Sequence, residues 1–243
     1  ADALAVAGDL GRGARVPAGS LGLSGAVMVG VHRAGSDLDL VVYGRESCKA
    51  VHRALGEGMA AGGALCPPDE EQLRELHAAH SPDTPLSFED FARLQRRKVN
   101  EGRYRGRALF LRFVQHPAEF GETYGQRRTE SAGRATVRAT VCDDTEAIYT
   151  PCRYGVRQVT VVQGVPVEDL REIISYRGRF SDQARAGEIA EARGSLERVV
   201  WETGESYHRL VVGGQAGDWL VARTQARVLG GGGPGPARGL PGT

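Results

Sequence analysis

The sequence predicts an α+β protein built from two folding units. Its first half alternates segments of helical periodicity with two apolar strand-like runs, at residues 37–43 and 107–114. From residue 134 onward, short strand-like runs recur between glycine turns, a pattern typical of a small antiparallel barrel or sandwich. With 243 residues and 41% hydrophobic content, the chain can bury a core in each unit. We therefore expect a small mixed sheet with helices at residues 1–126 and an antiparallel β domain at residues 127–226.

Helical spacing of apolar residues and capping residues predict four helices in the first domain. Asp69 is placed as the N-cap of the third helix, and Ser87 begins a capping arrangement for the fourth. The expected helices cover residues 1–10, 46–61, 69–80 and 88–101.

The strongest functional signal is the segment LSGAVMVGVHRAGSDLDLVVYG at residues 23–44. Its strand carries Asp37 and Asp39, which are two residues apart and therefore project from the same face. The opposite, apolar face is formed by Leu38, Leu40 and Val42. Same-face positions lie about 6.5–7 Å apart, so two carboxylates leaning together can share divalent cations such as Mg²⁺.

A glycine turn precedes this strand and suits a phosphate group. Gly25 lets the backbone approach a ligand closely, and residues 26–31 can present N–H groups at a helix start, where anions bind. The alternative is a pair of solvated aspartates beside an ordinary turn. Because the turn, the aspartates and the apolar strand occur together, we favour metal-assisted phosphoryl or nucleotidyl transfer.

These residues resemble the signature of the DNA polymerase β-like nucleotidyltransferase superfamily, in which Gly-Ser opens a phosphate-binding turn and Asp-x-Asp holds the metals. More closely, the chain resembles a group of predicted archaeal nucleotidyltransferases, through its glycine turn, its SDLDLVVYG strand and a later TPCRY segment. The resemblance implies a nucleotidyltransferase-like first domain in which Asp37 and Asp39 are the catalytic ligands of Mg²⁺ or Mn²⁺. The residues we expect around the nucleoside triphosphate are Ser24, Gly25, Ala26 and Ser36, the last of which would orient the carboxylates.

Two positions depart from the superfamily pattern. The serine expected after the turn glycine is Ala26, although Ser24 stands just before that glycine. The superfamily also takes a third carboxylate from a later strand, whereas residues 107–114 contain no Asp or Glu and Arg112 lies where an acid is expected.

Two functions are therefore open. One is a transferase that moves a nucleotidyl group from a nucleoside triphosphate to a hydroxyl of nucleic acid, protein or a small molecule. In that case an arginine from residues 93–112 would stabilise the departing pyrophosphate. The other is an inactive nucleotide- or RNA-binding regulatory protein that retains the fold.

Two groups of basic residues bear on RNA as a partner. The densest cluster lies on and after the fourth helix, and we interpret it as a solvated helix face or as a contact for triphosphate or RNA. This cluster is Arg93, Arg96, Arg97, Lys98, Arg103, Arg105 and Arg107. A second group mixes aromatic and cationic side chains, as single-strand nucleic-acid binders do, although a barrel surface or a dimer contact explains it equally well. It consists of Tyr176, Arg177, Arg179 and Phe180.

Residues 117–124 predict a short helix, and residues 125–133 a polar linker into the second domain. One further helix is expected at residues 167–174. The carboxylate-rich residues 143–146 are interpreted as an Asx-rich turn, ahead of a contribution to the metal site. The strand-like runs are residues 135–141, 146–150, 157–162, 195–201, 207–212 and 218–222.

Composition narrows the remaining possibilities. The net charge of +1 gives no overall field that favours nucleic acid or a membrane. The four cysteines show no metal-binding spacing, and without a disulfide framework we expect a cytoplasmic protein. No run has the length of a membrane span, and no signal-peptide pattern is present. The chain begins at Ala1, so we expect a processed or truncated piece of something longer, and the Gly/Pro-rich residues 227–243 predict a disordered tail.

Overall fold

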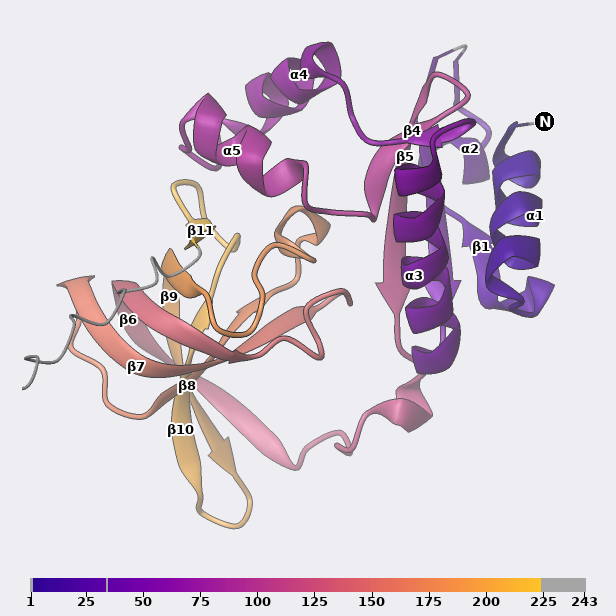
Figure 1. The fold of residues 1–243 in the computed structure, drawn as a ribbon. Coiled ribbons are helices and arrows are strands. Elements are labelled where there is room, and N and C mark those ends of the chain that lie inside the picture. Colours follow the sequence, from indigo (N-terminus) through magenta and orange to yellow (C-terminus); the bar gives the residue numbers. More distant parts are fainter. Residues whose placement is uncertain (1, 34, 224–243) are drawn as a thin grey trace, which may run out of the picture.

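The computed structural model describes residues 2–33 and 35–223, which form two units, each with its own β-sheet (Figure 1). The first sheet has the strand order β1-β2-β5-β4-β3, and the second has the order β10-β8-β7-β6-β9-β11. Both sheets contain parallel and antiparallel pairs, so the predicted α+β class is confirmed. The expected tail at residues 227–243 lies outside the described residues.

In the first unit, β2 lies between an antiparallel partner, β1, and a parallel partner, β5. The elements are α1 (Asp2–Ala14), β1 (Leu21–Leu23), α2 (Gly25–Met28), β2 (Leu38–Tyr43), α3 (Arg45–Ala61), β3 (Leu65–Cys66), α4 (Glu70–His80), α5 (Phe88–Gln95), β4 (Glu101–Tyr104) and β5 (Arg107–Val114). Short 3₁₀ turns lie at Ala18–Ser20 and Pro117–Glu119.

The core of the first unit covers one face of β2, as the sequence predicts. Leu38, Leu40 and Val42 are almost completely buried and pack with residues of α1 and α3. The helices fill this face because α3 presents its apolar stripe to the sheet. The other face of β2, which carries Asp39, is therefore left for a site.

The local capping signals are confirmed, but the fourth helix is shorter than predicted. Asp69 accepts a hydrogen bond from the Gln72 N–H and Ser87 accepts one from the Asp90 N–H. The helix α5 ends at Gln95 instead of near residue 101, because the next residues make contacts with the second unit. Among them, Lys98 is buried and donates to the Arg179 carbonyl at 2.5 Å.

The second unit is a barrel that closes through a β10–β9 pairing. Its strands are β6 (Arg127–Asp143), β7 (Cys152–Gly164), β8 (Leu170–Ser175), β9 (Ile189–Trp201), β10 (Ser206–Val211) and β11 (Trp219–Arg223). The neighbours β9-β6-β7-β8 have the Greek-key order. The pairings of this sheet are antiparallel, as expected, except that β8 and β10 run parallel.

Several predicted elements of this part also need correction. Residues 167–174 were expected to be helical, yet β8 occupies Leu170–Ser175, because pairing with β7 and β10 outweighs the local pattern. Most of the expected linker at residues 125–133 belongs to β6. Residues 146–150 form a turn with one isolated bridge, and the expected helix at 117–124 is only a 3₁₀ turn.

The buried carboxylate of Asp182 connects the two units. It lies in the loop between β8 and β9, where it accepts hydrogen bonds from the Val99 N–H at 3.2 Å and from His52 at 3.1 Å. Arg185 pairs with it from its own unit at 2.8 Å. His52 lies on α3 of the first unit, and its ring also packs at an angle against Phe113.

None of the described helices has the length and apolar character needed to cross a membrane. The four cysteines are free, as expected.

Candidate active site in the cleft between the two units

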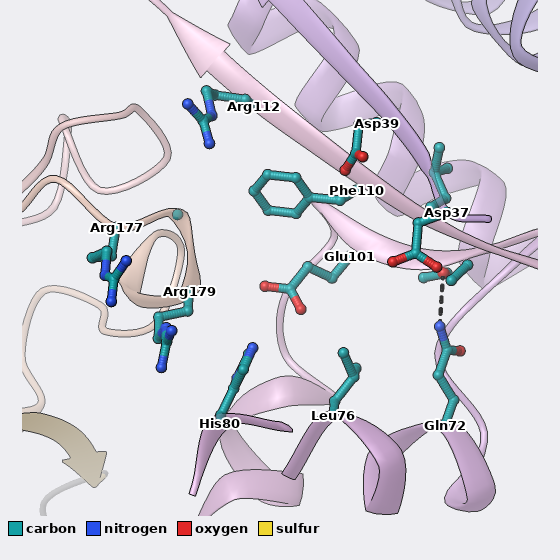
Figure 2. A pocket seen from close by; sticks show the side chains of 14 residues that line it. Asp37, Asp39, Gln72, Leu76, His80, Glu101, Phe110, Arg112, Arg177 and Arg179 are labelled. Carbon is teal, nitrogen blue, oxygen red and sulfur yellow. Dashed lines mark hydrogen bonds between the residues drawn. The ribbon is translucent and has the colours of Figure 1, made fainter. Parts of the chain in front are cut away.

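Asp37 and Asp39 lie where the sequence predicts, at the start of β2 and on the face opposite the core. Both line one cavity of about 290 Å³ (Figure 2). Asp37 is exposed and Asp39 is half-buried. In the described part of the chain, neither carboxylate has a hydrogen-bond or ion-pair partner. Two neighbouring, unpaired carboxylates in a cleft form a suitable binding site for a cation.

The turn before β2 brings its backbone against Asp39. Gly25 has a φ of +60°, and a Cβ built on it would overlap the Asp39 carboxylate, so both backbone conformation and space require glycine there. The Ser24 N–H donates to the Asp39 carbonyl at 2.9 Å. Within the described residues, the N–H groups of Gly25, Ala26 and Val27 have no protein acceptor.

Ser36 shapes the turn that precedes Asp37. Its hydroxyl accepts a hydrogen bond from the Arg33 N–H at 2.8 Å, and its carbonyl accepts one from Arg107. The serine therefore positions the backbone that leads into the aspartates, and its hydroxyl has its hydrogen bond within the turn.

The neighbour of Asp39 on β5 is Phe110, and not the acid that the superfamily pattern would place nearby. Arg112, which the sequence suggested for this position, is two residues further along and pairs in register with Val41. Phe110 in turn pairs with Glu101 on β4. Glu101 thus lies two strands from Asp39, about 10 Å between backbones, and still lines the cavity.

Glu101 is nonetheless engaged by the protein. Its side chain lies 3.6 Å from the Lys98 ammonium and accepts a hydrogen bond from Gln95. Lys98 and Glu101 are both buried, so each charge compensates the other. Sequence reasoning missed Glu101 because it was assigned to the end of a helix, whereas the strand β4 turns it into the cavity.

The remaining walls come from α4 and from the barrel. Figure 2 shows Gln72, Leu76 and His80 along one side and Arg177 and Arg179 on another, facing the sheet. The two arginines belong to the aromatic and cationic group of the second domain, and only the packing of the units brings them near the aspartates. Their separation in sequence, about 140 residues from Asp37, left no local signal for this proximity.

The cleft perturbs the pKa values of three groups. Burial and the neighbouring Asp37 raise the pKa of Asp39, and Arg112 opposes this shift. Burial, together with Arg179 and Lys98, lowers the pKa of His80 to about 4, so its ring is neutral near pH 7. Burial and the adjacent Arg177 lower the pKa of Arg179.

The basic cluster around α5 is in part a solvated face, since Arg96 and Arg105 are exposed, and in part interior, since Lys98 is buried. Its members pair with acids, so each positive charge has a negative charge close by. These pairs are Arg93–Asp90, Arg96–Glu70, Arg97–Glu188, Lys98–Glu101, Arg103–Asp69, Arg105–Asp9 and Arg107–Asp2. The carboxylate-rich turn likewise stays outside the cavity, since Glu146 pairs with Arg45.

Comparisons with known proteins identify a distant relative. No family model and no solved structure matches the chain. The chain is similar to an uncharacterized protein of Methanocaldococcus jannaschii, with 30% identity over 198 residues. The match covers 82% of this chain and 56% of the relative, so the chain spans little more than half of that relative's length.

Proposed function

We propose that the chain is a metal-dependent nucleotidyltransferase, which moves a nucleotidyl group from a nucleoside triphosphate to a hydroxyl acceptor. The observation that carries this proposal is the pair Asp37 and Asp39, unpaired within the described residues and adjoining a glycine turn with free N–H groups. The raised pKa of Asp39 reflects a carboxylate that a bound cation would stabilise.

The donor set suits Mg²⁺ or Mn²⁺. Among the described residues, no group of three His, Cys, Asp or Glu side chains could hold a metal alone. Mg²⁺ is usually bound through one or two carboxylates and completes its shell with water and substrate phosphates. Asp37 and Asp39 fit that arrangement, and the bound ion would neutralise charge that develops on the phosphate.

The chain's own groups would then orient the substrate. The free N–H groups of Gly25, Ala26 and Val27 would donate to phosphate oxygens, and Gly25 keeps the turn close to Asp39. Glu101 is the remaining carboxylate of the cavity and would accept the proton of the attacking hydroxyl from the other side of Phe110.

Incubation with each labelled nucleoside triphosphate and Mg²⁺ or Mn²⁺ tests the proposal. We expect label transfer or pyrophosphate release by the parent, and loss of both in Asp37→Ala/Asp39→Ala. A matched control is Glu57→Ala/Glu75→Ala, which removes two exposed acids outside the cavity. Activity that survives in the Asp37 and Asp39 variant would refute the assignment.

The second candidate is a binding protein that retains the fold without transfer. The observation that favours it is Phe110, an apolar side chain next to Asp39 on β5. Glu101→Gln separates the two functions in a single comparison. An enzyme loses transfer while it keeps nucleotide affinity, whereas a binding protein shows equal affinity for parent and variant and no transfer in either.

RNA is the less favoured partner. The basic residues near α5 are paired with acids, as described above. The five strands β6 to β10 close the barrel, and five-stranded Greek-key barrels of the OB type bind oligonucleotides along their second and third strands, which here are β7 and β8. A cavity near those strands is lined by four acids, Asp143, Glu146, Glu172 and Glu205, against two arginines. We therefore propose a small-molecule or protein hydroxyl as the acceptor.

A further inference from the structure

The loop between β8 and β9 projects two arginines into the cleft. Arg177 and Arg179 flank Gly178 in a 3₁₀ turn, Gly178–Phe180, and both line the cavity that contains Asp37 and Asp39. Figure 2 shows their guanidinium groups on the side of the cavity opposite Asp37. The cavity is thus anionic at one end and cationic at the other.

Contacts from both units hold this loop in place. The buried Lys98 donates to the Arg179 carbonyl at 2.5 Å, and the Tyr154 hydroxyl donates to the Phe180 carbonyl at 2.6 Å. Gly178 lies directly against the ring of Phe110, since a Cβ there would lie 2.6 Å from the ring. The backbone that carries the two arginines is therefore fixed before any ligand arrives, which lowers the entropic cost of binding.

The charges of the pair are incompletely balanced. Asp83 lies near both guanidinium groups, at 3.6 Å from Arg177 and 3.5 Å from Arg179, and its side chain is half exposed. Arg112 also lines the cavity, is exposed, and forms no ion pair within the described residues. Within the described residues, Arg177 and Arg179 form ion pairs with Asp83 alone, since Glu101, which lies near Arg179, is already paired with Lys98.

We propose that Arg177 and Arg179 of the barrel, with Arg112, bind the terminal phosphates of the nucleotide. Guanidinium groups are suited to this task because their planar N–H donors match phosphate oxygens in pairs. The inference rests on the proposed function for the identity of the ligand, and it assigns the polyphosphate to a site that only the two units together can form.

A purely structural role for these arginines predicts a different outcome. In that case Asp83 would serve to anchor the barrel to the loop after α4. Asp83→Asn distinguishes the roles, because removal of a competing carboxylate tightens polyphosphate binding several-fold at a binding site. A structural anchor would instead lose thermal stability in this variant, and its polyphosphate affinity would stay unchanged.

The binding experiment uses inorganic tripolyphosphate as the probe, measured by calorimetry on the full chain without metal. We expect parent binding that weakens with salt, and a loss of at least about tenfold in Arg177→Ala/Arg179→Ala. Arg157→Ala/Arg193→Ala removes the same charge from exposed barrel positions and should leave the affinity unchanged. Equal losses in both double variants, or no binding by the parent, would overturn the proposal.

Two further variants keep the test decisive. Arg177→Lys/Arg179→Lys retains the charge but loses the paired donors, and we expect most of the affinity to be lost in a folded protein. Asp37→Ala/Asp39→Ala should bind metal-free tripolyphosphate at least as tightly as the parent. If the parent binds tripolyphosphate through the arginines but transfers no nucleotide, then the proposed function fails while the phosphate site stands. If the parent transfers nucleotide and the arginine variants bind tripolyphosphate normally, then the proposed function stands and the phosphate site fails.

Discussion

At the scale of single residues, the ionised carboxylate of Asp39 lowers the stability of the folded protein. Its carboxylate is half-buried on a strand whose other face is the core. Burial and the neighbouring Asp37 raise its pKa, so the folded protein binds a proton more readily there than the unfolded chain does. Stability contributed by the protonated form is lost as the pH rises through the raised pKa.

Asp39→Asn should therefore raise the melting temperature of the metal-free protein near pH 7.5. The gain should disappear at a pH near 3, below the ordinary aspartate pKa of about 3.9, where the parent carboxyl is protonated as well. Melting curves in EDTA check this, and Mg²⁺ should stabilise the parent but not the variant. A lower melting temperature for the variant at pH 7.5 would contradict the expectation.

Gly25 offers a second test at this scale. Gly25→Ala places a methyl group on the Asp39 carboxylate and forces alanine into a left-handed conformation that costs about 1–2 kcal/mol. We expect a folded protein with greatly weakened binding of Mn²⁺ and nucleotide. Gly19→Ala is the control, because nothing lies within 4 Å of a Cβ there and its φ is not positive. Equal affinities in the two variants would show that the turn does not contribute to the site.

At the scale of elements, sequence reasoning works best where local chemistry decides the outcome. The helices α3 and α4 are predicted to within a residue or two, since apolar spacing and the Asp69 cap are encoded in neighbouring residues. Local reasoning fails for β8, whose pattern of Leu170 and Ile174 at helical spacing is overridden by partners on β7 and β10. It also fails at the end of α5, where Lys98 is drawn into the interface with the barrel.

The same limit applies to the candidate site. Asp37, Asp39 and Gly25 lie within fifteen residues of one another, so their proximity can be predicted from the sequence alone. Glu101, Arg177 and Arg179 enter the cleft through strand pairing and the docking of the units, for which no local pattern exists. The sequence therefore identifies the side of the cleft that carries Asp37 and Asp39, and it misses the residues of the other walls.

The helix α4 carries the pH-sensitive element of the cleft. Burial, Arg179 and Lys98 lower the pKa of His80 to about 4, compared with about 6.5 in the unfolded chain. The unfolded state therefore binds more protons between these values, and the protein loses stability as the pH falls from 6.5 towards 4. His80→Gln should flatten this part of the stability curve, whereas His32→Gln, at an exposed position, should leave its slope unchanged. Urea denaturation at pH 4.5, 5.5 and 6.5 would measure both.

At the scale of the whole molecule, Asp182 connects the two units. Burial alone would raise its pKa, but the hydrogen bond and charge of His52 and the charge of Arg185 outweigh this and lower it. Its contribution to stability is therefore present above the ordinary aspartate pKa of about 3.9 and is lost as the pH falls through the lowered value.

Asp182→Asn should destabilise the protein by about 2–3 kcal/mol at pH 7, because it weakens hydrogen bonds to a buried charged group. Since the carboxylate bridges the units, calorimetry should also show their unfolding separate into two transitions. Asp143→Asn, at an exposed carboxylate of the barrel, is the matched control and should melt like the parent. A single unshifted transition in Asp182→Asn would show that the units are coupled by other contacts.

The contact of Gly178 with Phe110 fixes how closely the barrel loop approaches β5 across the cleft. A larger side chain at either position would push the barrel loop away from β5. The guanidinium groups of the loop would then lie further from Asp37 and Asp39. We therefore expect evolution to alter these positions in concert, with bulk gained on one side offset by bulk lost on the other. Under the proposed function, these two uncharged residues would set the size of the ligand that the cleft can hold.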